Sequence, residues 1–183
     1  EKVLQASLSD SKSLKLYPVD LNIHDVIKDV VRNVAMQIRK QGGKVELSLK
    51  APNPIIRADK IHITNVIFNL LDNAIKYSPD GAQIEIISNQ TEDGVELLVK
   101  DNGVGIPKEY IGKVFERLFR VPTGNVHDVK GFGLGLSYVK TVIERHGGVI
   151  YVESEADKGS TFVVKLKFAH HLYESYFVRT ILI

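Results

Sequence analysis

The sequence contains no cysteine, and this absence removes several kinds of chemistry at once. Without a thiol the chain can form no disulfide, no thiolate zinc site and no cysteine nucleophile. An excess of one charge sign is also absent, because 24 Lys and Arg residues and 22 Asp and Glu residues leave a net charge of +2. So small an excess argues against a large nucleic-acid-binding surface. The chain also lacks an apolar run long enough to span a membrane, and it has no recognisable signal peptide.

The length and composition are those of one globular domain. Of the 183 residues, 44% are hydrophobic and 25% are charged, which is ordinary usage for a chain with a substantial core. The sequence begins with Glu1 rather than Met. We therefore interpret it as a fragment, and we expect any membrane anchor of the parent protein to lie upstream of it.

Hydrophobic periodicity predicts three long helices and a set of strands. Apolar residues at helical spacing follow Asn22 and Asp59, two side chains that can cap a helix N-terminus, and a third helix is predicted over residues 134–145. Strands are predicted over residues 17–21, 44–49, 55–58, 83–88, 95–100, 149–153 and 161–168. Because strands and helices do not alternate regularly, we predict an α+β fold. It is a two-layer α/β sandwich in which three helices cover a mixed, mostly antiparallel sheet.

The helix predicted over residues 60–77 has polar residues where a buried helix should be apolar. Its core face is formed by Ile63, Val66, Ile67, Leu70, Leu71, Ala74 and Ile75. A second face is a polar ridge of Asn65, Asn69, Asp72, Asn73 and Lys76. Asn is a mediocre helix former, so three of them in successive turns need a reason. One is a solvated face, and the other is a bound cation with phosphates, since amide oxygens suit Mg²⁺ and a lysine suits phosphate.

Three later segments decide between these interpretations. The segment from Asp101 to Pro107 reads DNGVGIP, the segment from Val114 to Arg120 reads VFERLFR, and the segment from Lys130 to Leu136 reads KGFGLGL and opens a helix. Together with residues 69–77, and in this order, they resemble the N, first glycine, F and second glycine boxes of sensor histidine kinases. That is the ATP-binding catalytic domain of the GHKL superfamily, which has the Bergerat fold. A dinucleotide-binding fingerprint is a poor alternative, because Leu136 stands where that motif needs glycine and no strand precedes it.

The resemblance covers roughly residues 17–168 and implies a division of the chain. Residues 1–16 would be the end of an upstream dimerisation helix and a linker, and residues 17–168 the catalytic domain. Residues 169–183 would form a tail of unknown role. The long, poorly patterned stretch from about residue 103 to 130 would be a mobile ATP lid, in keeping with the functional or disordered character of such loops.

At the base end of the expected nucleotide site, Asp101 stands where a strand ends and a glycine turn begins. A carboxylate there can accept a hydrogen bond from an exocyclic amine, although the motif alone equally fits an ordinary turn. The resemblance implies that Asp101 binds the adenine amino group. Gly103 and Gly105 permit positive φ and leave no side chain between backbone and base. Further candidates for nucleotide binding are Tyr77, which stacks on adenine or simply packs, Ile106 and Thr161.

At the phosphate end, Gly131, Gly133 and Gly135 precede a helix. Free amide groups and the helix dipole at such a position favour an anion, and the same glycines would also serve as a hinge. Lys76 and Arg120 are candidate phosphate-binding cations, with Lys130 a weaker one. The remaining candidates, by position in the boxes, are Phe132, Leu134 and Leu136, together with Phe115 and Phe119 as anchors of the lid.

The resemblance implies that Asn73 coordinates Mg²⁺, and that Asn69, one turn earlier, faces the phosphates, the ion or its waters. Gyrase-like and chaperone-like members have at this offset a glutamate that activates water. Asn69 cannot act as a general base at neutral pH, and Asp72 is a substitute that points partly away. The site therefore resembles one that holds Mg·ATP without efficient hydrolysis. Its candidate catalytic residues are Asn69, Asn73, Lys76 and Arg120.

None of the six histidines lies in a sequence that resembles the family's phosphoacceptor box; they are His24, His62, His127, His146, His170 and His171. We predict a catalytic domain that transfers the γ-phosphoryl group of ATP to a histidine on a separate dimerisation domain, which then serves a response regulator receiver domain. The expected setting is the cytoplasmic portion of a homodimeric, membrane-anchored sensor kinase without a nucleic-acid partner. Two alternatives stay open: a GHKL-type ATPase, and a nucleotide-binding interaction module without transfer activity.

Overall fold

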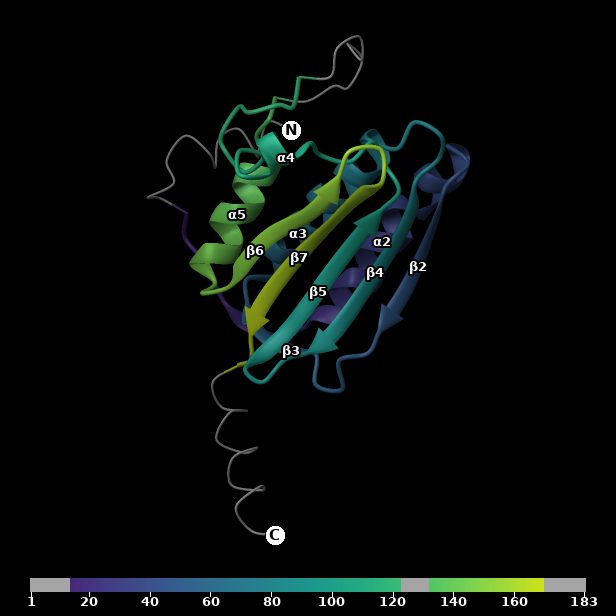
Figure 1. The fold of residues 1–183 in the computed structure, drawn as a ribbon. Coiled ribbons are helices and arrows are strands. Elements are labelled where there is room, and N and C mark those ends of the chain that lie inside the picture. Colours follow the sequence, from purple (N-terminus) through teal and green to yellow (C-terminus); the bar gives the residue numbers. More distant parts are fainter. Residues whose placement is uncertain (1–13, 123–131, 170–183) are drawn as a thin grey trace.

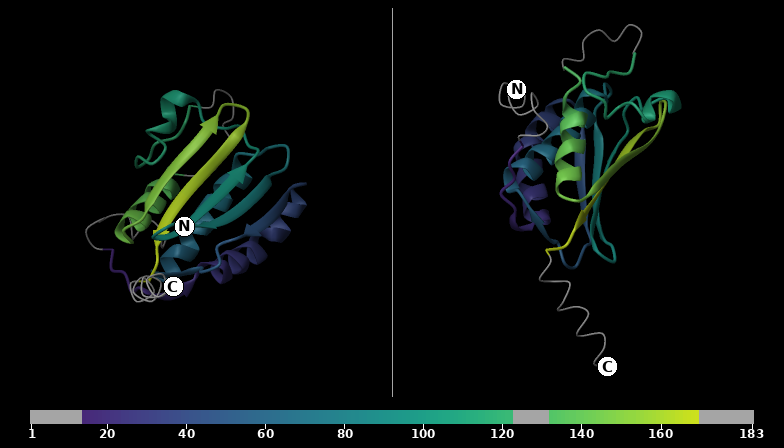
Figure 2. Two further views of the ribbon diagram at one scale, coloured as in Figure 1. Left: turned by 60° about the horizontal axis from the view of Figure 1, so that its bottom comes forward. Right: turned by 90° about the vertical axis from the view of Figure 1, so that its left-hand side faces the viewer.

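The computed structural model describes residues 14–122 and 132–169, and in these ranges the chain forms two layers. One layer is a five-stranded sheet, and three helices cover one face of it (Figures 1 and 2). The helices of that layer are α2 (Ile23–Lys40), α3 (Lys60–Lys76) and α5 (Gly135–Arg145), and a short α4 (Lys108–Ile111) lies near one end of the sheet. The predicted α+β class and the three covering helices are confirmed.

The sheet is mixed, as predicted, with a single parallel pair. Its strand order is β2-β4-β5-β7-β6, and only β2 and β4 run parallel. Its members are β2 (Lys44–Leu49), β4 (Gln83–Gln90), β5 (Gly94–Asp101), β6 (Val149–Glu155) and β7 (Gly159–Lys167). The first predicted strand and the strand at residues 55–58 belong instead to a separate antiparallel pair, β1 (Val19–Asn22) and β3 (Ile55–Ala58).

Strand alternation determines which side chains reach the helix layer. On β7, Phe162, Val164 and Leu166 are buried, and on β5 their neighbours Val95, Leu97 and Val99 are buried as well. Because successive side chains of a strand point to opposite faces, the residues between them face away from the helices. The solvent-facing side of the sheet carries cross-strand ion pairs, Lys100–Glu85 at 3.5 Å and Lys165–Glu96 at 3.3 Å.

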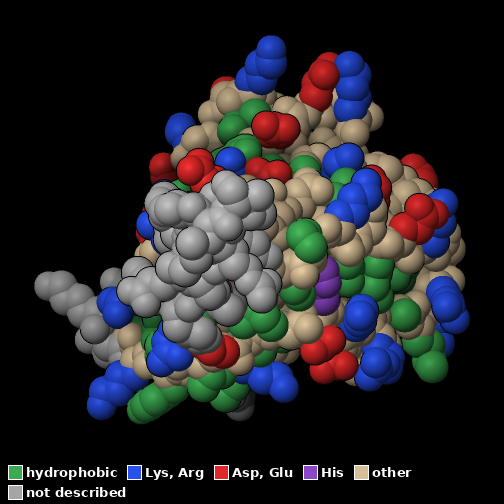
Figure 3. Space-filling view, turned by 90° about the horizontal axis from the view of Figure 1, so that it is seen from below, with side chains coloured by type: hydrophobic (Ala, Val, Ile, Leu, Met, Phe, Trp, Pro, Cys, Tyr) green, Lys and Arg blue, Asp and Glu red, His purple; other side chains and the backbone are tan. Residues whose placement is uncertain are grey.

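The surface at the opposite end of the sheet from α4 shows no sorting of charge among the atoms in view. Figure 3 shows Lys and Arg side chains interspersed with Asp and Glu side chains over the described part of that face. None of the helices in the two described ranges combines the length and the apolar character needed to cross a bilayer.

Helix α3 is the centre of the helix layer. The residues that it buries are the seven predicted core residues, from Ile63 to Ile75, and the polar ridge is half-buried or exposed. α3 lies between α2 and α5 and contacts both of them as well as β5. The apolar face thus holds the helix against the sheet, and its orientation directs the amide side chains of the ridge away from the core.

Asp59 fixes the start of α3 and joins three segments of the chain. Its Oδ1 accepts hydrogen bonds from the backbone N–H groups of Ile61 and His62 at 3.0 and 3.1 Å. Its Oδ2 accepts one from the N–H of Tyr17 at 2.9 Å. Its own N–H donates to Nε2 of His146, at the end of α5, at 2.9 Å. Burial alone would raise the pKa of Asp59, but the N–H groups of Tyr17, His62 and Ile61 stabilise the anion and lower the pKa below 3.8.

The first part of the predicted lid is anchored by aromatic side chains. The ring of Phe115 meets the buried ring of Phe162 edge-on, with centroids 6.4 Å apart, and Phe119 packs against Tyr110 at 5.9 Å. The N–H of Leu118 donates to the carbonyl oxygen of Gly133 at 2.9 Å. Residues 123–130 of the predicted lid lie outside the described residues, as do Gly131 and residues 1–13 and 170–183, so the domain boundaries stay predictions.

We expect Asp59→Ala to lower the free energy of unfolding by about 1–2 kcal/mol at pH 7, the usual effect of losing a helix cap. Asp59→Asn is the matched control, because its amide oxygen still accepts at Oδ1, and we expect it to retain most of the stability. Because the pKa of Asp59 is lowered in the folded state, its charge stabilises the protein fully above pH 3.8. This stabilisation is lost as the pH falls through the folded pKa. Urea unfolding from pH 7 downward measures both effects. Equal stability of Asp59→Ala and wild type at pH 7 would contradict this role.

Candidate nucleotide-binding site

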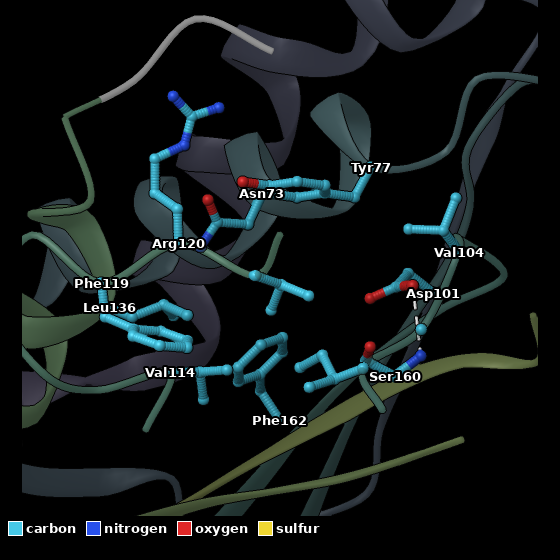
Figure 4. A pocket seen from close by; sticks show the side chains of 13 residues that line it. Asn73, Tyr77, Asp101, Val104, Val114, Phe119, Arg120, Leu136, Ser160 and Phe162 are labelled. Carbon is cyan, nitrogen blue, oxygen red and sulfur yellow. Dashed lines mark hydrogen bonds between the residues drawn. The ribbon is translucent and has the colours of Figure 1, made fainter. Parts of the chain in front are cut away.

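A pocket of about 650 Å³, including its open mouth, lies between the C-terminal half of α3, the turn after β5, the segment after α4 and the start of α5 (Figure 4). It brings together residues from all four sequence boxes. The predicted residues that line it are Asn73, Tyr77, Asp101, Gly105, Ile106, Phe119, Arg120 and Leu136. The remaining lining residues, which were not predicted from the sequence, are Val104, Val114, Val121, Ser160 and Phe162.

Asp101 lies at one wall of the pocket, at the end of β5. Its Oδ1 accepts hydrogen bonds from the N–H groups of Gly103 and Ser160, at 2.9 and 3.2 Å. Figure 4 shows the other carboxylate oxygen directed into the pocket. Burial raises the pKa of Asp101, and the two N–H groups only partly oppose that effect. A half-buried carboxylate with one oxygen directed into the pocket can accept from a neutral hydrogen-bond donor such as an amino group.

The glycines after Asp101 allow backbone segments to approach closely. A Cβ on Gly103 would lie 2.5 Å from the carbonyl oxygen of Tyr77, and a Cβ on Gly105 would lie 2.0 Å from that of Glu155. Gly105 has a positive φ of 66°, as predicted, but Gly103 is not among the residues with positive φ. Gly103 therefore does not use the positive φ that glycine permits. Glycine is needed there because the chain passes close to the end of α3.

The N-terminus of α5 faces the polar ridge of α3. Leu134 precedes the helix and gives it no side-chain cap, so the first N–H groups of α5 lack the acceptor that most helices provide. A Cβ on Gly135 would lie 2.8 Å from Oδ1 of Asn69. Nδ2 of Asn69 donates to the carbonyl oxygen of Asn65 at 2.7 Å, which fixes the amide. An uncapped helix start beside an asparagine amide is an arrangement that suits phosphate.

Several predicted residues lie near the pocket without lining it. The ammonium group of Lys76 forms an ion pair with Asp72 at 2.5 Å, because the two residues are one helical turn apart. Phe115 lies behind the pocket against Phe162, and Leu134 packs against the core. Phe132 is 62% exposed, and Gly133, with a φ of 68°, packs where a Cβ would meet Leu118. Lys130 and Gly131 lie outside the described residues.

Thr161 is not part of the pocket lining, whereas its neighbours Ser160 and Phe162 are. Strand β7 begins at Gly159, two residues earlier than predicted. Because its buried Phe162 faces the helices, alternation directs Thr161 away from the helix layer. On that face it is the register partner of Lys100 and Glu153. The buried Phe162 was the available signal, because residues on either side of an inward-facing side chain point outward.

Comparison with known proteins identifies this arrangement. Residues 58–170 match the family of histidine kinase-, DNA gyrase B- and HSP90-like ATPases. The chain belongs to this family.

Curated relatives and solved structures agree with this assignment. The sensor protein RprX of Bacteroides fragilis is 45% identical over 91% of this chain and 32% of RprX. The adaptive-response sensory kinase SasA of Gloeothece citriformis is 35% identical over 87% of this chain and 40% of SasA. The catalytic domain of histidine kinase ThkA has a TM-score of 0.72 at 28% identity, over 82% of this chain and 97% of that domain. The chain thus corresponds to the catalytic ATPase domain of sensor histidine kinases and spans well under half the length of these two curated relatives.

We expect Asp101→Asn to leave the unfolding midpoint at pH 7 unchanged or to raise it, while it weakens ATP binding more than GTP binding. The amide oxygen still accepts from Gly103 and Ser160, and the buried charge is gone. Since the pKa of Asp101 is raised in the folded state, protonated Asp101 stabilises the fold below pH 3.8, and this stabilisation is lost as the pH rises through the folded pKa. Any gain in stability of Asp101→Asn over wild type is therefore expected at neutral pH. Urea unfolding and calorimetric titration measure the two effects. A clear loss of stability at pH 7 would contradict the cost of burying this carboxylate. Equal weakening of ATP and GTP binding would show that Asp101 is only a turn residue.

Proposed function

We propose that this chain is the catalytic domain of a two-component sensor histidine kinase, which binds Mg·ATP and transfers the γ-phosphoryl group to a histidine on a separate dimerisation domain. The observation that carries the proposal is one pocket with the half-buried carboxylate of Asp101 at one end, and with Asn73 and the uncapped start of α5 at the other. ATP has an amino group at one end and phosphates at the other, in keeping with this polarity.

At the base end, the free oxygen of Asp101 would accept a hydrogen bond from the adenine amino group. Ile106, which is 8% exposed, and the buried Val114 supply apolar surface for the flat face of a purine. Tyr77 lines the same region from the end of α3, where stacking on the base and packing against the turn are compatible.

At the phosphate end, the first N–H groups of α5 and the guanidinium group of Arg120 would hold the anionic oxygens. The amide oxygen of Asn73 is the ligand type that Mg²⁺ prefers, and this side chain lies in the pocket. When bound, Mg²⁺ neutralises phosphate charge. Asn69 would face the phosphates, and Lys130 and Gly131 stay candidates on sequence grounds. Lys76 is a weaker candidate, since it is paired with Asp72.

The site favours transfer over hydrolysis. An asparagine such as Asn69 cannot take a proton from water at neutral pH, and the Asp72 carboxylate is paired with Lys76 at 2.5 Å. Catalysis would then consist of positioning and charge stabilisation. In the reaction, an acceptor imidazole nitrogen forms a bond to the γ-phosphorus as the bond to the β–γ bridging oxygen breaks, and ADP leaves.

The acceptor would come from another domain, because the described histidines have structural partners. Nε2 of His24 lies 2.7 Å from Oγ of Ser88, and Nδ1 of His62 lies 2.8 Å from the hydroxyl of Tyr138. His146 bonds through both ring nitrogens, to the N–H of Asp59 and the carbonyl oxygen of Val142. His127, His170 and His171 lie outside the described residues.

A response regulator is the expected final acceptor. Histidine kinase ThkA in complex with response regulator protein TrrA matches this chain with a TM-score of 0.76 at 26% identity, over 93% of this chain and 47% of the matched chain. We infer a similar partner here, and a homodimeric parent protein whose catalytic domain is cytoplasmic and whose membrane anchor lies upstream.

The test is to mix this chain with its parent's histidine-bearing dimerisation domain and γ-labelled ATP. We expect acid-labile, base-stable phosphate on the added domain, and we expect Asn73→Ala to lower the rate at least about tenfold, as losses around metal ligands do. Asn89→Ala is the matched control, because Asn89 lies on β4 away from the pocket.

Each outcome distinguishes the alternatives. Free phosphate without protein phosphate would identify an ATPase, and nucleotide binding without either product would identify an interaction module. Transfer at the wild-type rate by Asn73→Ala would remove Asn73 from the metal site.

A further inference from the structure

Ser154 of β6 lies behind the base end of the pocket, and its hydroxyl group makes three hydrogen bonds. Its Oγ accepts from the N–H of Ile106 at 2.8 Å and donates to the carbonyl oxygen of Gly159 at 2.8 Å. It also lies 2.9 Å from Oγ of Ser160. Ile106 and Ser160 both line the pocket, whereas Ser154 does not. Ser154 thus joins two pocket residues from outside the pocket.

The direction of each hydrogen bond follows from the number of protons. A serine hydroxyl has one proton and two lone pairs. A carbonyl oxygen only accepts, so the proton of Ser154 is directed to Gly159. The N–H of Ile106 uses one lone pair of Ser154, and Ser160 must donate its proton to the other. The hydroxyl proton of Ser160 therefore points toward Ser154, and the remaining lone pairs of Ser160 are left to accept.

Ser160 lies beside Asp101, as Figure 4 shows, and its N–H donates to Oδ1 of that residue at 3.2 Å. An ionised carboxylate also only accepts. With Asp101 ionised, the pocket wall formed by Asp101 and Ser160 is therefore a pair of acceptors. An amino group has two hydrogens to donate to such a pair, directly or through a water molecule. A keto oxygen has none, so a 6-oxo purine could donate only through its single N1–H and would leave one acceptor unpaired, which costs binding energy.

We propose that Ser154 is a positioning residue for base specificity: it fixes the direction of the Ser160 hydroxyl group, and so makes the pocket select 6-amino purines over 6-oxo purines. This inference rests on the proposed function, because it concerns the base of the same nucleotide. It adds a residue that does not touch the ligand and that acts through the polarity of one hydrogen bond.

The test is the ratio of the dissociation constants of ITP and ATP, measured by calorimetric titration with Mg²⁺. ITP has a keto oxygen in place of the 6-amino group of ATP, and its N1 carries a hydrogen, so it presents one donor hydrogen on this edge where ATP presents two. In Ser154→Ala the hydroxyl of Ser160 is free to rotate and donate to a keto oxygen. We expect the ratio to fall by about threefold to tenfold, the usual effect of one hydrogen bond. A purely structural role for Ser154 would weaken both nucleotides equally and leave the ratio unchanged.

Two further variants serve as controls. Ser154→Thr keeps the hydroxyl group and should restore the ratio. Ser88→Ala removes another buried serine, which bonds His24 and the N–H of Ala51 far from the pocket, and it should lower stability without changing the ratio. If Ser154→Ala does not fold, Ser160→Ala tests the same wall, and its ratio should also fall.

The outcomes separate the inference from the proposed function. A high ratio in wild type that is unchanged in Ser154→Ala, or unchanged in Ser160→Ala, would overturn the inference alone. If the ITP and ATP dissociation constants of the wild type are nearly equal, Asp101 and Ser160 do not distinguish the two bases. The proposed recognition of adenine would then be wrong together with the inference.

Discussion

The arrangement of the whole molecule depends on how α3 packs against the sheet. Seven buried aliphatic side chains hold this helix, and each fully buried Leu, Ile or Val contributes about 1.5–3 kcal/mol. Burial of this apolar face fixes the orientation of α3 about its own axis. This orientation places Asn69 next to the start of α5 and Asn73 in the pocket. The polar ridge is thus positioned by the apolar face opposite to it.

The site itself is built largely from backbone groups brought close together. The turn after β5 passes the end of α3 at Gly103 and the end of β6 at Gly105, both at distances that no Cβ would permit. These approaches bring the end of β5, the end of α3 and β7 around Asp101. The carboxylate is then desolvated, which raises its pKa and makes its charge costly in the absence of a ligand. The carboxylate of Asp101 thus lowers the stability of the folded protein while it provides a hydrogen-bond acceptor for a ligand, as is common at binding sites.

Much of the fold was predictable, because local signals and long-range packing agree. The apolar face of α3, the caps at Asn22 and Asp59, and the strands β2 and β3 appear in the sequence as they do in the structure. Pocket residues were predictable where a motif marks them, as at Asp101 and Asn73. The less predictable features depend on register and on partners distant in sequence. Thr161 was predicted in place of Ser160, its neighbour in the pocket lining, and the sequence did not reveal the three bonds of Ser154, whose partners lie on other segments of the chain.

The central claim is that one pocket binds a nucleotide with its base at the end of β5 and its phosphates at the start of α5. Amide ¹H–¹⁵N spectra of this chain, recorded with adenosine and then with Mg·ATP, test it most directly. We expect adenosine to shift the amide signals of Gly103 and Ser160, and we expect Mg·ATP to add large shifts at Gly135, Leu136 and Ser137. If Mg·ATP shifts the α5 amides no more than adenosine does, or if the largest shifts fall on the outer face of the sheet, the account is contradicted.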